Sequence, residues 1–210
     1  MKRFLWAVLM TSWISGFTDE SVETSAESYS QKVFKCIPPL WEVKGSYFFF
    51  ASSVMRDIYG SGGFEAQMSG SYPICRGLQI YGSVGFLEAW GQSQNFHQDT
   101  SIWQIPVDLG LKPVITIASF AEYYLAVGPR YFYVHQHNDS NYVNKNTSRN
   151  GAGLFVNTGF NFFPIPHLLV DVFAEYAYEP TNFSSDIRNV YGGDVQVSLF
   201  NFGAGIGYAF

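Results

Sequence analysis

The two histidines that flank Gln136 are the residues whose type and spacing come nearest to a reactive site. His135 and His137 stand two positions apart, so their side chains would share one face of a strand. Imidazole serves as a general base or a metal ligand near neutral pH, and Asp139 and Ser140 follow closely. A histidine pair alone is short of the ligands that a metal site needs, and no complete nucleophile, base and acid set accompanies it. We therefore predict no catalytic residues, no metal and no cofactor, and retain His135 and His137 as a candidate rim site.

A set of charged residues falls on alternate positions of the stretches that we predict to be strands, opposite the apolar face. They are Glu65, Asp108, Lys112, Glu122, Arg130, Asp171 and Glu175. Inside a narrow barrel an unpaired charge is unstable, so most of these side chains must pair. We place Arg130 at the centre, with Glu122, Asp171 and Glu175 as partners. The prediction is a charge network that plugs the lumen. A narrow cation-preferring pore is the alternative, because acids outnumber bases.

Stretches of period-two alternation position these residues. Apolar side chains recur at every second position, which is typical of a β-strand with one apolar face. The stretches are residues 43–52, 64–72, 78–86, 103–112, 121–131, 154–162, 170–178 and 200–210. The faces of the first stretch are ambiguous. We expect a bulge or a strand end near Pro106 and Pro129, since proline cannot donate to the ladder, and a bulge or a change of exposure near Ser198.

The connections between these stretches alternate in length. Short turns follow the second, fourth and sixth stretches, and each contains proline: Pro73, Pro113, and Pro164 with Pro166. Mostly longer polar segments follow the others, at residues 56–61, 91–101, 136–150 and 179–192. This alternation is typical of transmembrane barrels. Aromatic residues near strand ends suit two interfacial girdles, namely Trp41, Tyr72, Trp90, Trp103, Tyr131, Tyr133, Phe162 and Phe163. We predict an all-β fold, an eight-stranded antiparallel up-and-down transmembrane β-barrel over residues 41–210, with short periplasmic turns and mostly longer extracellular loops.

The C-terminal stretch ends on an aromatic residue. Phe202, Ile206, Tyr208 and Phe210 are apolar at alternate positions, with small residues between them. The pattern resembles the terminal signature of bacterial outer-membrane β-barrels, in which the assembly machinery reads such side chains. The alternative is an ordinary terminal strand of a β-sandwich.

The N-terminal segment reads as an export signal. Lys2 and Arg3 precede an apolar run that extends to Gly16, the layout of a secretory signal peptide. We assign residues 1–16 to this signal, with cleavage between positions 16 and 26, and residues 17–40 to a polar, disordered mature N-terminus.

The two cysteines, Cys36 and Cys75, precede the first strand and lie in the first short turn, respectively. Both would then face the periplasm, an oxidising compartment that permits a disulfide. We predict a Cys36–Cys75 disulfide, with pairing between two chains as the alternative.

Composition agrees with alternating strands. Aromatic residues make up 19% of the chain and charged residues 14%, against about 25% charged in typical globular proteins. After the N-terminus no run approaches the roughly 18 apolar residues of a spanning helix. The net charge of −5 argues against a nucleic-acid partner.

Residues 41–210 resemble the small eight-stranded outer-membrane barrels, which include the transmembrane domain of outer-membrane protein A, outer-membrane protein X and the opacity adhesins of Neisseria. The resemblance rests on the strand pattern, the turn asymmetry and the terminal Phe210. It implies a bacterial outer-membrane location, with outer-membrane lipids, lipopolysaccharide and the barrel assembly machinery as partners.

The function that we predict is that of a structural or surface-interaction protein. It would act like an adhesin, meeting host or surface ligands through its extracellular loops, and it would not be an enzyme. The alternative is an outer-membrane lipid-modifying enzyme of the lipid A deacylase or acyltransferase class. The His-x-Ser pair of that deacylase family is replaced here by His135-Gln136-His137, and no Glu follows on the sixth stretch.

Overall fold

The computed structural model describes residues 38–60, 62–92, 99–139, 145–180 and 197–210. Almost all of these residues lie in strands because the chain alternates apolar and polar side chains with period two. The elements are β1 (Leu40–Phe50), α2 (Ser53–Tyr59), β2 (Gly63–Cys75), β3 (Leu78–Gln92), β4 (Asp99–Ala118), β5 (Ala121–Asn138), β6 (Asn146–Ile165), β7 (Leu168–Tyr178) and β8 (Leu199–Ala209).

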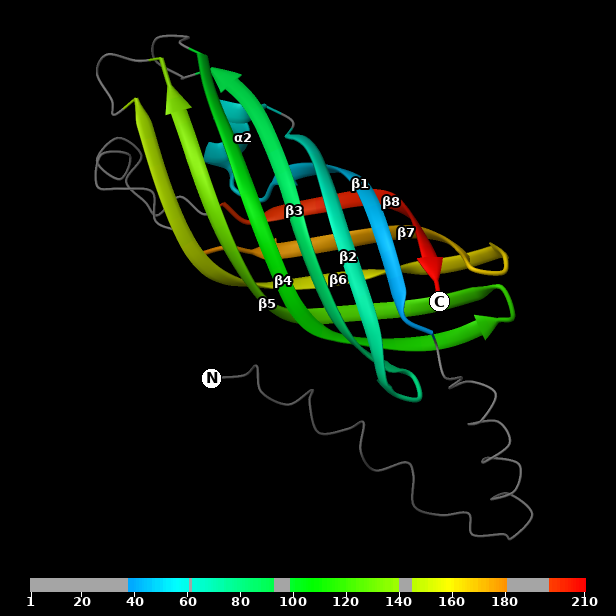
Figure 1. Ribbon diagram of the computed structural model, residues 1–210. Helices are drawn as coiled ribbons and strands as arrows, with labels where there is room; N and C mark the ends of the chain where they lie inside the picture. The colour runs from blue at the N-terminus through cyan, green and yellow to red at the C-terminus, as the bar shows by residue number, and fades with distance from the viewer. Residues whose placement is uncertain (1–37, 61, 93–98, 140–144, 181–196) are drawn as a thin grey trace, which may run out of the picture.

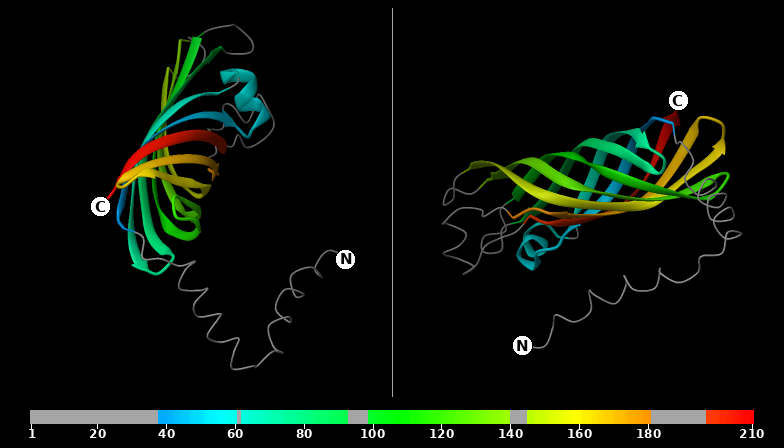
Figure 2. Two further views of the ribbon diagram at one scale, coloured as in Figure 1. Left: turned by 90° about the vertical axis from the view of Figure 1, so that its right-hand side faces the viewer. Right: turned by 90° about the horizontal axis from the view of Figure 1, so that it is seen from below.

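The eight strands close into one barrel in chain order (Figure 1). Each strand pairs antiparallel with its sequence neighbours, and β1 closes the barrel against β8 from Leu40–Ala209 to Phe50–Leu199. Figure 2 shows the tilt of the strands from two further sides. Closure pairs the strand that would otherwise be left at each edge. The predicted eight-stranded up-and-down barrel is confirmed.

The two ends of the barrel differ. At one end, which we call the turn end, the strands are joined by the short segments 76–77, 119–120 and 166–167. The start of β1 and the end of β8 lie at the same end. The opposite end, the loop end, carries α2 and the three longer connections. There β4, β5 and β6, with 20, 18 and 20 residues, project beyond the shorter β1, β7 and β8 (Figure 1). The predicted alternation of short turns and longer loops is confirmed.

The prediction that Pro73, Pro113 and Pro164 lie in the short turns is wrong. Strand β2 continues through Pro73 to Cys75, and β6 continues through Pro164 to Ile165, whereas Pro166 does lie in a turn. The fourth strand continues through Pro113 to Ala118, and the turn follows at residues 119–120. Pro113 pairs with Leu78, the first residue of β3. The proline therefore stands where the neighbouring strand ends, so its missing N–H interrupts little of the ladder.

The bulges or strand ends expected near Pro106 and Pro129 are also not found. Both prolines lie inside strands, and Pro129 keeps its place opposite Leu154 of β6. Next to Pro106 the pairing of β3 with β4 lapses and then resumes in the same register. A single proline removes one donor, and the pairs on either side hold the register. Near Ser198 the apolar residues change faces: Val197 and Leu199 are buried in the barrel, whereas Phe200 and Phe202 are exposed on the outer wall.

The short helix α2 was not predicted. Its residues 56–59 fall in the segment 56–61 that was predicted to be a loop. Met55 and Tyr59, one turn apart, are buried against the barrel interior. The helix ends at Gly60, whose φ of 64° favours glycine. A side chain on Gly91 of β3 would collide with the backbone of Ile58, so this glycine allows α2 to dock. Within the described part of the chain, no helix has the length and apolar character needed to cross a membrane.

The two faces of the barrel wall differ in polarity. Large apolar side chains cover the outer face of every strand, including Trp41, Phe64, Leu109, Val127, Phe160, Val172 and Ile206. The inner face carries most of the buried charged and amide side chains. On β8 three of the inward positions, 203, 205 and 207, are glycines, and a side chain at Gly205 would strike Lys44 of β1. The small residues of β8 thus leave room for the long charged side chains of its neighbour.

Apolar clusters lie inside the barrel near both ends. The loop-end cluster joins Met55 and Tyr59 of α2 to Phe48, Phe50, Leu87, Ala89, Ile102, Val134, Ala177, Val197 and Leu199. The turn-end cluster consists of Leu40, Val114, Tyr124, Leu169, Phe173 and Ala209. Phe163, which was expected in an outer girdle, packs against this inner cluster. On β1 the charged residues Glu42 and Lys44 lie between Leu40 of the turn-end cluster and Phe48 of the loop-end cluster.

Candidate functional site

Arg130 of β5 is buried inside the barrel and forms ion pairs with three carboxylates. Its Nε and Nη2 donate to the two carboxylate oxygens of Asp108 on β4, at 2.6 and 2.8 Å. Nη2 also lies 2.5 Å from Glu175 Oε1 on β7, and Nη1 lies 3.4 Å from Glu179 Oε1. The planar guanidinium suits such a two-pronged contact. We call these four residues the loop-side network.

Amide and hydroxyl side chains from other strands support the carboxylates of this network. Ser83 Oγ donates to Asp108 at 2.8 Å, and Asn157 Nδ2 donates to Glu175 at 2.8 Å. Gln104 Nε2 lies 2.8 Å from both oxygens of Glu179. Each carboxylate therefore receives a neutral donor besides the guanidinium, as a buried charge requires.

A fourth carboxylate stands beside the loop-side network. Asn201 Nδ2 of β8 lies 2.5 Å from Glu65 Oε2 and 3.3 Å from Glu175 Oε1. Glu65, like Arg130, is buried. This region of the lumen thus holds four carboxyl groups around one guanidinium, so it carries an excess of acid.

A second group of charges lies nearer the turn end. Lys44 Nζ lies 2.7 Å from Asp171 and 3.0 Å from Glu42, and Lys112 Nζ lies 3.3 Å from Glu42. Both ammonium groups also face aromatic rings, with Lys112 Nζ 4.1 Å from the ring centre of Tyr124. We call Glu42, Lys44, Lys112 and Asp171 the turn-side network. Its two bases match its two acids.

Tyr124 and Asn157 connect the two networks. The Tyr124 hydroxyl lies 2.9 Å from Asp171 and 3.1 Å from Asn157 Oδ1. Asn157 donates through its other amide atom to Glu175 of the loop-side network. Polar contacts therefore run along the lumen from the turn side to the loop side.

The structure places all seven predicted lumen residues in the barrel interior. Of the partners expected for Arg130, Glu175 is in contact, whereas Asp171 pairs with Lys44. Glu122 is buried on β5, opposite Thr116 and Asn161 of the adjacent strands.

Three participants were not predicted: Glu42, Lys44 and Glu179. Glu42 and Lys44 lie on the first strand. Aromatic residues occur on both faces of that strand, so the alternation did not show which face is directed into the barrel. Glu179 follows β7 directly, in a stretch that was assigned to a loop. Glu179 lies four residues after Glu175, so a continued strand would direct both side chains to the inner face. This spacing could have predicted its position.

The two rim histidines lie on the outer face of β5 at the loop end. His135 stacks on Trp103 with 5.2 Å between ring centres, and its Nδ1 lies 2.7 Å from Ser148 Oγ on β6. His137 Nδ1 lies 2.7 Å from Asn146 Oδ1, and its Nε2 lies 3.3 Å from Asp139 Oδ1. Among the residues that the structure describes, no three His, Cys, Asp or Glu side chains are grouped to hold a metal ion. The two histidines thus contact neighbouring polar groups individually.

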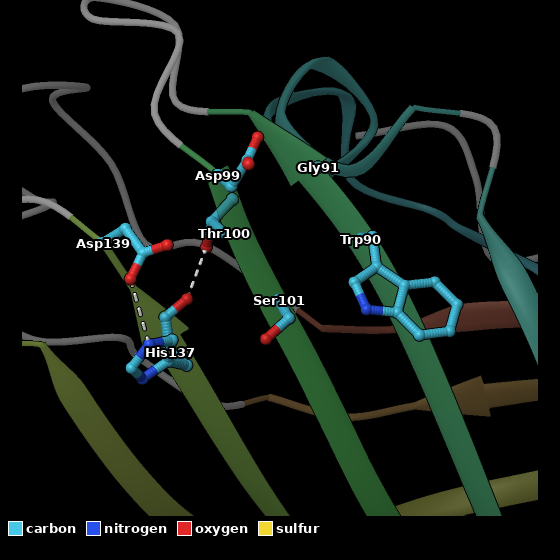
Figure 3. A pocket seen from close by; sticks show the side chains of 7 residues that line it. All are labelled: Trp90, Gly91, Asp99, Thr100, Ser101, His137 and Asp139. Atoms are coloured by element: carbon cyan, nitrogen blue, oxygen red, sulfur yellow. Dashed lines mark hydrogen bonds and ion pairs between the residues drawn. The ribbon is translucent and has the colours of Figure 1, made fainter.

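A cavity of about 420 Å³ opens beside His137. We call it the rim pocket. Figure 3 shows the residues that line it, which come from β3, β4, β5 and the position directly after β5: Trp90, Gly91, Asp99, Thr100, Ser101, His137 and Asp139. Thr100 Oγ1 lies 3.1 Å from the His137 carbonyl oxygen and 3.3 Å from the Tyr59 hydroxyl of α2. Burial raises the pKa of Tyr59 to about 12, so this hydroxyl keeps its proton at neutral pH.

The remaining predicted sites lie along β8 and at the turn end. Phe202, Ile206, Tyr208 and Phe210 all have exposed side chains, and the Phe210 amide donates to Pro39. Cys75 is exposed at the turn between β2 and β3. Its predicted partner Cys36 lies outside the described residues, as do the signal peptide and most of the polar N-terminal segment, so these remain predictions.

Comparison with known proteins identifies solved structures that have a similar fold. No protein-family model matches the chain, and no curated protein matches it. Among solved structures, Neisserial surface protein A is 16% identical over 82% of this chain and 97% of its own, with a TM-score of 0.54. Ail, the attachment invasion locus protein of Yersinia pestis, is 14% identical over 82% of this chain and 97% of its own, with a TM-score of 0.49. A major outer membrane protein from Thermus thermophilus is 13% identical over 82% of this chain and 99% of its own, with a TM-score of 0.48. The chain has the fold of the small eight-stranded outer-membrane β-barrels.

Proposed function

We propose that this chain is an integral outer-membrane protein whose lumen is closed by its own side chains and whose loop end acts as an adhesin-like interaction surface. In this proposal the N-terminal segment is removed on export, and the barrel assembly machinery inserts the chain through the signal that ends at Phe210. Outer-membrane lipids and lipopolysaccharide surround the wall.

The outer face supports the membrane location. Side chains such as Leu109, Val127 and Ile206 are exposed around the barrel and would be unfavourable in water. The closed ladder satisfies the backbone groups within the wall, which a hydrocarbon environment requires. Aromatic residues, including Trp41 and Tyr208 at the turn end and Trp103 toward the loop end, suit the two membrane interfaces.

The content of the lumen is the observation that carries the proposal. Besides the loop-end and turn-end clusters, the lumen holds the loop-side network around Arg130 and the turn-side network around Lys44. Eight-stranded barrels have interiors just wide enough for side chains to fill. An ion would have to separate the Arg130–Asp108 contact and then cross an apolar layer, so passage is strongly opposed.

With the lumen closed, the surface that remains for recognition is the loop end. There β4, β5 and β6 extend beyond the other strands, and the rim pocket and the polar side chains of Asn146 and Ser148 are exposed. Binding residues commonly lie on segments held by a rigid scaffold. We assign contact with host or other surface ligands to this end.

Trypsin accessibility and adhesion test the proposal in one strain. Cells of a Gram-negative host expressing the chain should be cleaved after Lys145 at the loop end, and after Arg76 at the turn end only when the outer membrane is permeabilised. These cells should adhere to host cells more than vector controls, and trypsin treatment of intact cells should remove the gain. Cleavage after Arg76 in intact cells would refute the orientation, and unchanged adhesion would refute the interaction role.

Two observations favour other functions, and each has its own test. The acid excess around Arg130 would favour cations if the lumen opened, so conductance decides between a plug and a narrow pore. The His135–Ser148 contact brings a base to a hydroxyl at the membrane interface, as a lipid-modifying enzyme needs. We expect mass spectra of lipid A and phospholipids to be the same with the chain, with its His135→Ala variant and with empty vector. A change of acyl chains that His135→Ala abolishes would establish the enzyme.

A further inference from the structure

A groove of about 360 Å³ lies on the outer wall of the barrel, where β1 closes against β8. We call it the seam groove. Figure 1 shows these two strands side by side, with the end of β8 at the turn end. The lining comes from four neighbouring strands: Trp41, Glu42 and Val43 of β1, Met68 of β2, Leu168 of β7, and Ile206, Gly207 and Tyr208 of β8.

The side chains that line the seam groove are large and either aliphatic or aromatic. Trp41, Met68 and Ile206 are all more than half exposed. Glu42 also borders the groove, but its carboxylate is buried in the lumen beside Lys44, so only its backbone reaches the outer wall. The volume falls within the roughly 300–1,000 Å³ of small-molecule sites. An apolar groove in the outer wall of a membrane barrel suits an acyl chain.

The seam groove continues toward the middle of the wall over two small residues. Gly45 of β1 lies opposite Ala204 of β8, one outward position beyond Val43. A Cβ added to Gly45 would meet no heavy atom within 4 Å, so the wall is hollow on the outer side of this glycine. Tyr47 and Phe202 occupy the next outward positions and end the hollow. The hollow therefore extends away from the turn end, in the direction that an acyl chain takes from a head group at the membrane interface.

Polar groups stand at the turn end of the seam groove. The His167 ring stacks on the Tyr208 ring, with 5.4 Å between their centres and 13° between their planes. His167 Nδ1 lies 2.6 Å from the Ala209 carbonyl oxygen. Because a carbonyl oxygen only accepts, Nδ1 carries the hydrogen and Nε2 is left for another partner. The Tyr208 hydroxyl forms no hydrogen bond to any other residue that the structure describes, so it too can bond to a ligand.

These polar groups are held in place before any ligand arrives. The Ala209 amide donates to the His167 carbonyl oxygen at 2.9 Å, so two hydrogen bonds join these residues. Among the described residues other than glycine, His167 alone has a positive φ, of 69°, which such residues seldom adopt. Phe210 lies edge-on to Tyr208, with 5.0 Å between ring centres. A site ordered in advance loses less entropy on binding.

We propose that the seam groove binds one glycerophospholipid of the periplasmic leaflet. An acyl chain lies along the seam from Trp41 to Gly45, and the phosphate and ester oxygens meet the Tyr208 hydroxyl and His167. Nε2 of His167 donates to a phosphate when the ring is protonated, and accepts from an ethanolamine ammonium when it is neutral. This inference rests on the proposed function, because it requires the wall to lie in the outer membrane with the turn end in the periplasm.

The test uses the full-length mature chain, refolded from urea into lipid-free detergent micelles. Native mass spectrometry measures the affinity of the first bound molecule of phosphatidylethanolamine, phosphatidylglycerol or lipid A, and also the oligomeric state. Gly45→Leu fills the hollow, Tyr208→Phe removes only the hydroxyl, and His167→Asn removes the imidazole but keeps a residue that tolerates a positive φ. Ala152→Leu is the matched control, because it enlarges a small outward residue of β6, away from the seam.

We expect one phospholipid molecule to bind more tightly than any further one. Gly45→Leu should weaken this first binding at least about fivefold, because the new side chain takes the place of the acyl chain. Tyr208→Phe and His167→Asn should each weaken it about two- to fivefold, because each removes one hydrogen-bonding group. Ala152→Leu should leave it unchanged.

The inference is overturned if Gly45→Leu binds the first phospholipid within about twofold of the unaltered chain. It is also overturned if lipid A binds more tightly than both phospholipids, or if Gly45→Leu separates a dimer instead of releasing lipid. Should Gly45→Leu not fold, unchanged affinity in both Tyr208→Phe and His167→Asn would refute the site.

The proposed function is judged separately by trypsin accessibility, adhesion and conductance of the same protein. Cleavage after Arg76 in intact cells would refute the orientation but would leave phospholipid binding in micelles as it is. A barrel in the proposed orientation that binds no phospholipid selectively would refute the seam groove alone.

Discussion

Replacing Arg130 with methionine tests how far the loop-side network stabilises the barrel. The substitution keeps an unbranched side chain of moderate length but removes the one guanidinium that Asp108, Glu175 and Glu179 share. Breaking a buried ion pair by removing one partner destabilises a protein by roughly 3–5 kcal/mol, because a charge is left uncompensated. Since two of the three contacts are 2.8 Å or shorter, we expect a loss in this range.

Lys112→Met is the matched control. It also removes a buried base from the lumen, but Lys112 has one ion pair, at 3.3 Å, and Glu42 retains Lys44 at 3.0 Å. We expect a loss of about 1–2 kcal/mol, because the remaining acids keep a base beside them. Adding Asp108→Asn and Glu175→Gln to Arg130→Met should recover more than half of the loss, because two of the unpaired charges are then absent.

Urea unfolding in lipid bilayers measures these differences, with tryptophan fluorescence and the gel mobility of the folded barrel as probes and linear extrapolation to zero denaturant. The reasoning is refuted if Arg130→Met loses less than about 1 kcal/mol, or if Lys112→Met loses as much. Failure of the triple variant to recover would show that the loss comes from packing around Arg130 rather than from charge.

Three further predictions concern other parts of the chain. Gly91→Val should detach α2, because the new side chain would collide with the backbone of Ile58. Trypsin cleavage after Arg56 should then become at least about tenfold faster while the barrel stays folded. An unchanged cleavage rate would contradict the docking of α2 on the barrel. Cys36 and Cys75 should form a disulfide, so the intact mass of the unreduced mature chain should equal that of an oxidised monomer, and labelling of both thiols by maleimide would contradict this. Phe210→Ser should slow insertion of the chain into the outer membrane of cells. It should lower the unfolding free energy of the purified barrel by no more than about 1 kcal/mol, because the Phe210 side chain is exposed. Insertion at the unaltered rate would contradict its role as an assembly signal.

The barrel itself could be predicted because the alternation of apolar and polar residues is repeated in every strand. Each strand must alternate to separate lumen from exterior, so period two recurs eight times, and closure follows from the even count and the short turns. The positions of Glu65, Asp108 and Arg130 on the inner face follow from parity alone.

The partners within the lumen could not be predicted from parity. Which acid meets Arg130 depends on the stagger between strands, and the register places Asp108 opposite Arg130 on β4 while Asp171 falls level with Lys44 on the other side. A shift of two residues would preserve every face and change every pair. The sequence alone does not set that stagger.

The helix α2 was missed for a different reason. Its apolar residues Met55 and Tyr59 stand four apart, and Gly60 follows as a helix end. Seven residues are too few for a helix that is stable by itself. The helix forms because the loop-end cluster accepts these two side chains, and that cluster exists only once the barrel has closed. The rim pocket likewise depends on residues from three strands.

Electrical conductance across a planar lipid bilayer tests the central claim most directly. The purified full-length mature chain, folded and inserted in one orientation, is held under voltage in potassium chloride. We predict no unitary current steps, because apolar clusters and ion pairs fill the lumen. Regular cation-selective steps from the unaltered chain would contradict it and would identify the loop-side network as part of a conduction path.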